Sequence, residues 1–369
     1  MKIASYNVEN LFRRAKALNQ DEDIAKKVNE EIATLNSLLR KKKYTDNDKL
    51  EIIELLVSLG MQKSDTGTYA ELRKHKGQLL KRDKNTNAIT IVADGSDNWI
   101  GDVVHKLEPV DELAIFHTGK VIAEVNADIL GIVEAEDRIT LDKFNRQVIK
   151  NAGGVIYNQV MVIDGNDERG IDVGLMTREG YTIEQIIPHI YDLDQRGKKI
   201  FSRDCPEYLV ITPTNERIWV LPNHFKSKFG GDTVASRNKR KAQSERTAEI
   251  YNALKNRGEQ KIIVMGDLND TPDSVAITPL ILSTDLQEIS NHPTFDTGKY
   301  KGKGTYGTGT DSNKIDYILL SPELYNRVTA SGIYRKGAWT ASNRWEMLPT
   351  IKKEVHAASD HHLIWCEIS

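Results

Sequence analysis

The sequence predicts an α+β fold: a four-layer sandwich in which two mixed, largely antiparallel sheets pack together and helices flank them. Short apolar runs rich in β-branched residues recur from about residue 121 onward, and such runs favour strands over helices. Few helical patterns separate these runs, which indicates two packed sheets and mostly antiparallel pairing. Of the 369 residues, 39% are hydrophobic and 28% are charged, a composition typical of a globular protein with a sizeable core.

The first strand is followed by a segment of different character. The chain begins with an apolar run that ends at Asn7, and residues 14–115 then carry mainly helical patterns. Helices are predicted over Asp21–Lys43 and Thr45–Gly60, and residues 76–84 and 88–93 are candidate strands. We therefore expect residues 1–13 and 116–369 to form one domain, with 14–115 inserted as a mainly helical subdomain.

The helix over residues 45–60 has the clearest start. Its first residues, Thr45-Asp46-Asn47-Asp48, are typical of a capping box. Leu50, Ile53, Glu54 and Val57 then recur at helical spacing.

The remaining elements follow in order along the chain. A long helix is predicted over Ser236–Arg257, before Gly258, a residue suited to a helix C-cap. The predicted strands are Ile129–Val133, Val155–Tyr157, Gln159–Ile163, Val173–Met176, Tyr208–Ile211, Ile218–Leu221, Ile262–Met265, Ile315–Leu320 and Leu363–Ile368.

Composition excludes several classes of protein. The formal net charge is -2, from 51 Lys+Arg against 53 Asp+Glu, which excludes a histone-like polycation but not a local basic groove. Cys205 and Cys366 lie far apart without metal-ligand spacing, so we expect two buried free thiols, although one bridge stays possible. No run approaches the roughly 18 apolar residues of a membrane span, and none at the N-terminus resembles a signal peptide. We expect no membrane association and a cytoplasmic location, or secretion if a leader has been removed.

Polar side chains end five of the apolar runs. These ends carry Asn7 and Glu9, Glu134, Asn223 and His224, Asp267 and Asn269, and Asp360 and His361. A strand that ends in such residues places oxygen and nitrogen ligands at one edge of a sheet, where they can converge on a hard cation such as Mg²⁺.

Six segments in a fixed order make the sequence resemble a known family. They are SYNVEN at 5–10, GIVEAED at 131–137, NHFKSK at 223–228, GDLND at 266–270, KIDYILL at 314–320 and SDHH at 359–362. The chain thereby resembles the endonuclease/exonuclease/phosphatase superfamily, which includes deoxyribonuclease I and exonuclease III-type enzymes, and especially its bacterial nuclease-like branch. The resemblance spans the chain except for residues 14–115.

The resemblance implies a metal site and a set of catalytic residues. Glu134 is the expected main ligand of Mg²⁺, or of Mn²⁺, with Asn7 beside it. Glu9 and Asp360 are further candidate ligands, although Glu9 is almost as well explained as a solvated turn residue.

The implied catalytic residues prepare water and hold the phosphate. Asp267 is expected to orient or deprotonate the attacking water, and Asn269 to hold that water or a phosphate oxygen. His361 is expected to contact the phosphate, with Asp316 hydrogen-bonded to its imidazole and favouring the protonated form. His224, within the NHFKSK segment, matches a second catalytic histidine of the deoxyribonuclease I branch.

Basic residues after His224 suggest a phosphate-rich substrate. From Lys226 to Arg246 the sequence holds seven basic residues against two acidic ones, which suits a phosphate backbone; a solvated basic helix start is the alternative reading. Arg169 is a candidate phosphate ligand and Asp172 a candidate support for His224, with surface salt bridges as the alternative. The remaining candidate substrate-binding residues are Asn223, Lys226, Lys228 and Arg240.

These features favour a metal-dependent nuclease acting on DNA, with RNA possible, and no obligate protein partner is evident. The segments that mark inositol polyphosphate phosphatases, and the apolar hairpin of sphingomyelinases, are missing from the sequence. A phosphoesterase acting on a lipid, an inositol phosphate or another small molecule is the alternative function. A catalytically inactive binding module is a second alternative.

Overall fold

The computed structural model describes residues 1–19, 22–167, 169–228 and 231–369, which divide into two compact units. Unit 1 comprises Met1–Phe12, Val110–Lys228 and Asp232–Ser369, and unit 2 comprises Arg13–Pro109 together with Gly231. Each unit buries a hydrophobic core of its own, so each is described by itself.

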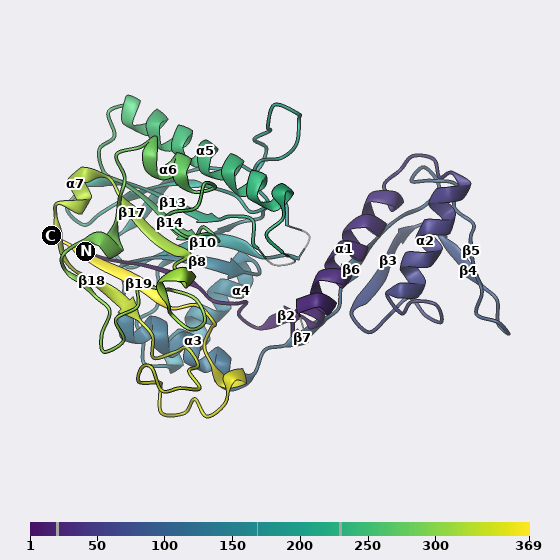
Figure 1. Cartoon of the computed structure of the whole chain (residues 1–369), viewed down its shortest axis with the longest axis horizontal. Helices are drawn as coiled ribbons and strands as arrows, with labels where there is room; N and C mark the ends of the chain where they lie inside the picture. Colours follow the sequence, from purple (N-terminus) through teal and green to yellow (C-terminus); the bar gives the residue numbers. More distant parts are fainter. Residues whose placement is uncertain (20–21, 168, 229–230) are drawn as a thin grey trace. The chain divides into compact units, whose positions relative to one another are not determined.

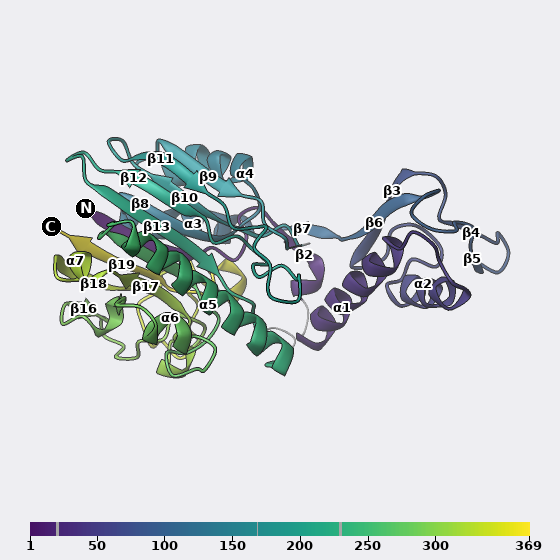
Figure 2. The same cartoon turned by 90° about the horizontal axis from the view of Figure 1, so that it is seen from above.

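Unit 1 is built on two large sheets (Figures 1 and 2). The seven-stranded sheet has the order β16-β18-β19-β1-β8-β10-β9, and the six-stranded sheet has the order β11-β12-β13-β14-β17-β15. The first sheet comprises β1 (Lys2–Asn7), β8 (Ile129–Ala135), β9 (Gln159–Ile163), β10 (Asp172–Thr177), β16 (Phe295–Asp296), β18 (Val328–Tyr334) and β19 (Leu363–Ile368). The second comprises β11 (Thr182–Ile187), β12 (Glu207–Ile211), β13 (Arg217–His224), β14 (Ile262–Asp267), β15 (Gln287–Glu288) and β17 (Asp316–Leu320).

The inner faces of the two sheets share one core. Ile3 and Ile129 of the first sheet and Val220 and Ile263 of the second are fully buried in the same cluster. Gly131 of β8 permits this close approach, because a Cβ there would lie 2.9 Å from the sulfur of Met265 on the facing sheet. The inner layer is therefore packed too tightly for a larger residue at position 131.

Helices cover the outer face of each sheet. On the seven-stranded sheet, α3 (Glu112–Val125), α4 (Arg138–Lys143) and the adjoining turn η2 (Phe144–Ile149) enclose a second core. On the six-stranded sheet, α5 (Val234–Asn256) and α6 (Thr278–Leu282) enclose a third (Figure 2). The short helices α7 (Pro322–Tyr325), η3 (Ile289–Asn291), η4 (Asp311–Asn313) and η5 (Glu354–His356) lie in connections. The predicted four-layer sandwich of mixed sheets is confirmed.

One predicted strand of unit 1 is wrong. Residues 155–157 form no strand, because the side chain of Asn145 hydrogen-bonds to both the backbone amide and the backbone carbonyl of Tyr157. Neither group is then free to pair with a neighbouring strand. Asn145 Nδ2 donates to the Tyr157 carbonyl (2.9 Å) and its Oδ1 accepts from the Tyr157 amide (2.8 Å). The side chain of Tyr157 is nevertheless buried. The apolar run in the sequence therefore reflects burial of side chains and not pairing between strands.

Unit 2 combines two helices with three strand pairs, so the expectation of a mainly helical insertion is incomplete. The helices are α1 (Glu22–Leu39) and α2 (Asp46–Ser58), and Asp21, where the first was expected to begin, lies outside the described residues. The strand pairs are β2 (Arg13–Ala15) with β7 (Leu107–Pro109), β3 (Ala70–Lys76) with β6 (Ile100–His105), and β4 (Leu80–Arg82) with β5 (Ile89–Ile91); η1 (Lys16–Asn19) is a 3₁₀ turn.

The cap of α2 is as predicted, but its buried face is not. Thr45 and Asp48 form a reciprocal capping box. Ile52 and Leu56 are buried, whereas Leu50 is 60% exposed and Val57 is 42% exposed. The expected apolar positions therefore include two that face solvent.

Two further expectations concern the cysteines and membranes. Cys205 and Cys366 are both buried and unpaired, as predicted. Among the helices that the structure describes, none has both the length and the apolar content needed to cross a bilayer.

Candidate active site

Parallel strand pairs bring predicted site residues to one edge of each sheet. In the first sheet β1 and β8 run parallel, with Asn7 opposite Val133, so Asn7 and Glu134 end neighbouring strands. In the second sheet β13 and β14 run parallel, with His224 opposite Asp267. Asp316, the first residue of β17, pairs with Asp267 in the antiparallel ladder. Carboxyl ends of parallel strands meet at one edge, which is why residues distant in sequence converge.

A β-bulge presents Glu134. The β8–β10 register pairs Val133 with Val173 and Ala135 with Asp172, which leaves Glu134 as the extra residue. Its φ is 67°, and two other candidate site residues, Glu9 (52°) and Asn269 (54°), also have positive φ. Such conformations are costly for residues other than glycine and cluster at functional sites. The bulge turns the Glu134 side chain out of the regular alternation of the strand.

The SDHH segment is tied to the end of β1. Ser359 Oγ donates to the Asn7 carbonyl (2.8 Å) and accepts from the His361 amide (3.0 Å). The Asp360 amide donates to Glu9 Oε2 (3.0 Å). These bonds fix Asp360 and His361 beside Asn7.

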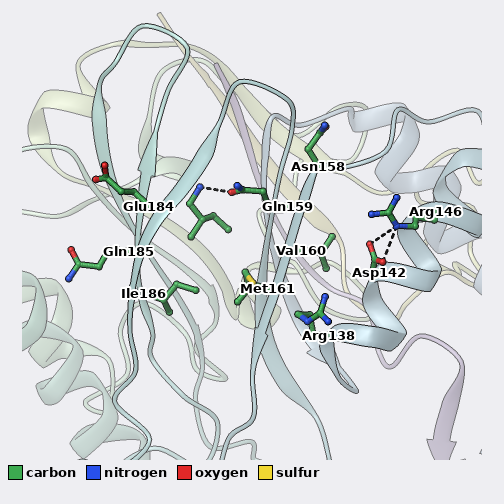
Figure 3. Close-up of a pocket in the computed structure, with 11 residues that line it drawn as sticks. Arg138, Asp142, Arg146, Asn158, Gln159, Val160, Met161, Glu184, Gln185 and Ile186 are labelled. Atoms are coloured by element: carbon green, nitrogen blue, oxygen red, sulfur yellow. Dashed lines mark hydrogen bonds and ion pairs between the residues drawn. The ribbon is translucent and has the colours of Figure 1, made fainter.

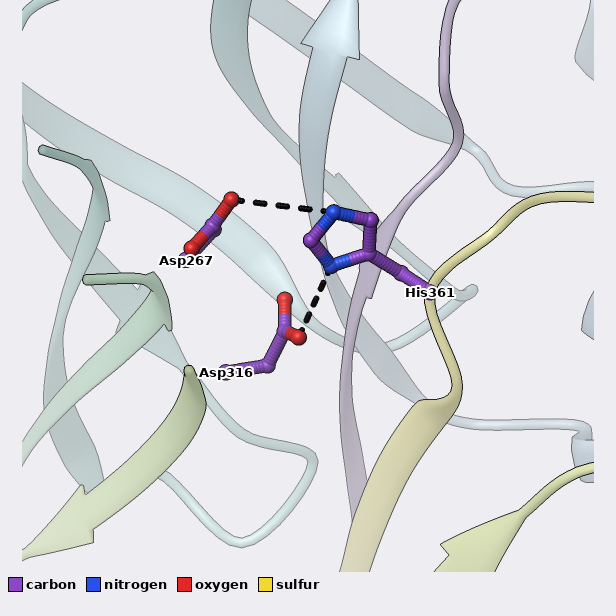
Figure 4. A group of neighbouring side chains, drawn as sticks. All are labelled: Asp267, Asp316 and His361. Atoms are coloured by element: carbon purple, nitrogen blue, oxygen red, sulfur yellow. Dashed lines mark hydrogen bonds and ion pairs between the residues drawn. The ribbon is translucent and has the colours of Figure 1, made fainter. Parts of the chain in front are cut away.

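The imidazole of His361 is held between two carboxylates (Figure 4). Its Nδ1 lies 2.8 Å from Asp316 Oδ2, and its Nε2 lies 3.9 Å from Asp267 Oδ2. Asn7 Nδ2 donates to the same oxygen of Asp267 (3.2 Å). Asp316 thus sets the orientation of His361, as the sequence predicted for this pair.

His224 lies on the other side of Asp267. Its Nε2 is 3.7 Å from Asp267 Oδ2 and 3.8 Å from Glu134 Oε1. Its Nδ1 is buried and has no hydrogen-bond partner among the described residues. Asp172, the expected support of His224, instead accepts from the Gly165 amide (2.8 Å).

The two histidines differ in charge. Burial lowers the pKa of His361, but the adjacent Asp316, followed by Asp360 and Asp267, raises it well above the ordinary value. Burial lowers the pKa of His224 well below it, and the guanidinium groups of Arg203 and Arg169 act in the same direction. His361 is therefore held as a cation and His224 as a neutral imidazole.

Asp267 is poised to accept a proton. Burial, and then the charge of Asp316, raise the pKa of Asp267 to about 7. Its Oδ1 accepts from the Asn269 amide (2.8 Å), and Asn269 Nδ2 donates to the Phe225 carbonyl (3.1 Å). A carboxylate with a pKa near neutrality suits general base chemistry.

The oxygen-rich donor set fits a hard divalent cation. The Glu134 carboxylate makes no hydrogen bond to a described residue, and Asp360 Oδ1 is buried without a hydrogen-bond partner in the part of the chain that the structure describes. Oxygen atoms of this kind are the ligands that Mg²⁺ and Mn²⁺ prefer. Ligand atoms of Asp267, Asp316 and His361 also lie within 4.8 Å of one another. In that second group Asp316 is already engaged by His361, which leaves Glu134 and Asp360 better placed to hold a metal.

Two of the expected substrate-binding residues are buried supports instead, which corrects the expectation for them. Asn223 is fully buried, donates to the Leu221 carbonyl (3.1 Å) and accepts from Thr247 (3.3 Å). Arg240 is fully buried and contacts Asp232, Asp270 and the Lys226 carbonyl. Both residues belong to the layer between β13 and α5, and groups of the protein already satisfy their polar atoms.

The other three expected substrate-binding residues, Lys228, Arg169 and Lys226, have different surroundings. Lys228 pairs with Asp270 (2.5 Å), so its charge is matched. Arg169 contacts Asp167 through Nε (3.0 Å) and Nη2 (2.8 Å). Lys226 is partly buried, and burial, followed by the charges of Arg169 and Arg203, lowers the pKa of its amino group.

Arg203 was missed by sequence reasoning. It lies in a loop between strands, within no recognisable motif, and its side chain is 1% exposed. Its Nε is 2.9 Å from Asp167, and its Nη1 donates to the Phe225 carbonyl (3.3 Å) that also binds Asn269. No local pattern signals this arginine, because its partners Asp167 and Phe225 come from two other segments of the chain.

A cavity of about 470 Å³ lies elsewhere, along the edge strands β9 and β11 (Figure 3). Its lining includes Arg138, Gln159 and Glu184 and contains none of the candidate site residues. The candidate site itself is therefore formed by strand ends and loops.

Comparisons with known proteins agree with the fold. A sequence profile described as the endonuclease/exonuclease/phosphatase family matches residues 81–341. No curated protein sequence matches the chain.

The solved structures that the chain resembles are distant from it in sequence. The mannosyl-6-phosphatase of Bacteroides thetaiotaomicron is 14% identical with a TM-score of 0.51, covering 70% of this chain and 91% of its own. Truncated TDP2 of Caenorhabditis elegans is 15% identical with a TM-score of 0.48, covering 69% and 90%. The human Nocturnin catalytic domain is 15% identical with a TM-score of 0.47, covering 71% and 88%. At these identities the likeness concerns the fold alone.

Proposed function

Because the chain belongs to the endonuclease/exonuclease/phosphatase family, we propose that it is a divalent-metal-dependent nuclease that hydrolyses DNA phosphodiester bonds. Members of this family are metal-dependent hydrolases of phosphoester bonds. The observation that carries the proposal is the convergence of Glu134, His224, Asp267 and His361, with contacts of 3.7–3.9 Å between imidazole and carboxylate atoms. The segment that follows His224 carries more basic than acidic residues, which favours a nucleic acid among the possible phosphoesters. Arg240 and Lys228 of that segment are paired with carboxylates and do not add to this argument.

Each residue of the site has a role in hydrolysis. Asp267 accepts the proton of the attacking water, because its pKa of about 7 makes it an effective base near neutral pH. Asn269 and Asn7 orient Asp267 and the water through their amide groups. Cationic His361 donates a hydrogen bond to a non-bridging phosphate oxygen, where negative charge develops. The ester bond to the leaving oxygen breaks as the new P–O bond forms.

A divalent cation fits beside these residues. Glu134, Asp360, Asn7 and Glu9 would hold Mg²⁺ or Mn²⁺ through oxygen atoms. When bound, the cation supplies positive charge that offsets the charge developing on the phosphate. Neutral His224 lies between Glu134 and Asp267, where its Nε2 can donate to the phosphate or take up a proton.

A substrate panel tests the proposal. The purified protein is incubated with supercoiled plasmid, single-stranded DNA, RNA, bis-p-nitrophenyl phosphate, a sugar phosphate, an inositol phosphate and sphingomyelin. Each reaction is run with Mg²⁺, with Mn²⁺ and with EDTA. We expect cleavage of DNA with either metal and none in EDTA, with activity restored when excess Mg²⁺ is added back.

Two results would contradict the proposal. Hydrolysis of a sugar, inositol or lipid phosphate without cleavage of any nucleic acid would assign the site to a small-molecule phosphoesterase. No hydrolysis of any substrate, with a folded protein that still binds DNA, would indicate a binding module.

A further inference from the structure

Two arginines and a lysine lie beside the candidate site, and one carboxylate contacts both arginines. Arg169 and Arg203 both contact Asp167, at 2.8 Å and 2.9 Å. Lys226 interacts with the same three groups, and its Nζ forms no ion pair or hydrogen bond to a described residue. Arg169, Arg203, Lys226 and Asp167 are called the cationic cluster below.

The cluster is buried, so its unmatched charge is costly. The side chains of Arg203, Asp167 and Arg169 are 1%, 10% and 18% exposed. A buried charge without a partner costs several kcal/mol per ion. Arg203 Nη2 is buried and has no hydrogen-bond partner among the residues that the structure describes. Arg203 therefore holds a donor here that none of the described residues satisfies.

Among the described residues, the other carboxylates near the cationic cluster do not balance its charge. Burial raises the pKa of Asp172 to about 7, so near neutral pH it carries only part of a charge. Glu134 interacts with both arginines, but it is the expected main ligand of the metal. Burial, followed by the charges of Arg169 and Arg203, lowers the pKa of Lys226 to about 8. Each of these observations indicates an excess of positive charge that an anion would relieve.

The cluster is joined directly to the candidate catalytic residues. Arg203 Nη1 and Asn269 Nδ2 donate to the same carbonyl, that of Phe225 (3.3 Å and 3.1 Å). Phe225 lies between His224 and Lys226 in the sequence, and its amide donates to the Asp267 carbonyl (2.9 Å). An anion at the cluster would consequently lie next to the phosphate that His224 and Asp267 face.

We propose that the cationic cluster is a second phosphate subsite, which binds a phosphate adjacent to the scissile one in the same substrate. The inference rests on the proposed function and narrows its substrate class to phosphodiesters that carry a neighbouring phosphate. Arg203 Nη2 has no hydrogen-bond partner among the described residues, and guanidinium groups are the donors best suited to phosphate oxygens. Lys226 supplies the unpaired charge.

The first test compares dinucleotides that share one scissile bond. Dithymidylate is used with free hydroxyl ends, with a 5′-phosphate and with a 3′-phosphate. We expect one of the phosphorylated forms to be cleaved with a kcat/KM about tenfold higher than the hydroxyl-ended form, the size of effect typical of a charge-assisted contact. In Lys226→Ala, kcat/KM should fall more for that form than for the hydroxyl-ended one, reducing the ratio to about threefold or less.

Controls separate the subsite from general charge effects. Lys150→Ala removes an exposed lysine of unit 1. It should leave the ratio of kcat/KM between the phosphorylated and the hydroxyl-ended dinucleotide at the wild-type value. Arg203→Lys retains the buried charge but loses the planar guanidinium group with its several N–H donors. If this variant folds, it should also reduce the ratio of kcat/KM between the phosphorylated and the hydroxyl-ended dinucleotide. Because the wild-type ratio is itself diagnostic, the test does not depend on any variant being stable.

A binding measurement distinguishes the two proposals. Calorimetry in EDTA compares thymidine 3′,5′-bisphosphate with thymidine 5′-monophosphate, and we expect tighter binding of the bisphosphate that weakens in Lys226→Ala. Equal affinities, or equal kcat/KM for all three dinucleotides, would overturn the subsite. Tighter binding of the bisphosphate without cleavage of plasmid DNA, single-stranded DNA or RNA would keep the subsite and overturn the nuclease.

Discussion

His361 and His224 show how neighbours set the charge of a buried imidazole. Both side chains are almost completely buried. His361 contacts Asp316 through Nδ1 at 2.8 Å, whereas the Nδ1 of His224 has no partner among the described residues. The positive guanidinium groups of Arg203 and Arg169 add to the desolvation of His224. One site thus holds a hydrogen-bonding cation and a neutral imidazole at once.

Replacing either Glu134 or His361 should abolish most of the turnover. Glu134→Gln removes the charge expected to bind the metal, and His361→Gln removes the cation that faces the phosphate. We expect each variant to lose at least about 100-fold in kcat/KM for bis-p-nitrophenyl phosphate with Mg²⁺. Glu249→Gln, at an exposed carboxylate of α5, is the matched control. Near-wild-type rates in either site variant, with an unchanged melting temperature, would disprove the assignment.

A third histidine, outside the site, predicts a pH dependence of stability. His189 lies 2.9 Å from both Asp192 and Glu207. Burial alone would lower the pKa of His189, but the hydrogen bond to Glu207 and the charge of Asp192 raise it above the ordinary value. A raised pKa means that the folded state binds the proton more tightly, so the contribution is complete below about pH 6.5 and is lost as pH rises through the folded-state pKa.

His189→Gln should therefore destabilise the protein more in acid than in base. We expect a loss of about 1–2 kcal/mol in the free energy of unfolding at pH 6 and a smaller loss at pH 9. Denaturant unfolding at the two pH values measures the difference. His75→Gln is the control, because His75 pairs with Asp102 while 59% exposed. A loss at pH 9 equal to or larger than that at pH 6 would contradict the sign.

At the scale of elements, β13 and β14 position His224 and Asp267 by their close pairing. Gly266 of β14 lies opposite Asn223, with φ of 129°, and a Cβ there would come within 2.0 Å of the Asn223 carbonyl oxygen. No side chain fits between these strands at this point. The GDLND segment therefore requires glycine for a steric reason, in addition to any chemical role of its neighbours.

Gly266→Ala should push β13 and β14 apart. We expect a loss of about 3 kcal/mol or more in the free energy of unfolding, together with loss of activity as His224 and Asp267 separate. Gly258→Ala is the control, because Gly258 also has positive φ (90°) but no neighbouring atom within 4 Å; it should cost only about 1 kcal/mol. Similar melting temperatures for the two variants would argue against a steric role.

Strand prediction succeeded where burial and backbone pairing coincide. The run 159–163 is β9 with the expected bounds, and 363–368 is β19. The strand predicted over 155–157 is wrong, because the side-chain amide of Asn145 takes the place of the hydrogen bonds that a neighbouring strand would make. Along α2, spacing alone did not identify the buried face, because the direction in which a helix packs is set by its tertiary neighbours.

At the scale of the whole molecule, the insertion is separable. Unit 2 buries its own core, which includes Leu35, Ile52 and Trp99. The chain leaves and re-enters unit 1 at adjacent points, since the Val110 amide donates to the Phe12 carbonyl (3.0 Å). A short linker can consequently join Phe12 to Val110 without strain on unit 1.

Replacing residues 13–109 with a short Gly-Ser linker tests the role of the insertion. We expect unit 1 to keep its fold, measured by circular dichroism and thermal unfolding. We also propose that the insertion restricts which substrates enter, so the deletion should change the ratio of rates on plasmid DNA and on dithymidylate. An unchanged ratio in a folded variant would refute that role.

The sequence by itself determined the family, the four-layer class and most of the polar residues at the strand ends. It could do so because each of these features is local: a run of apolar residues, or a motif at the end of a strand. Only the tertiary structure showed that Asn223 and Arg240 are buried supports and that Arg203 joins the site. The state of such residues depends on contacts between segments far apart in the chain, and no local pattern encodes those contacts.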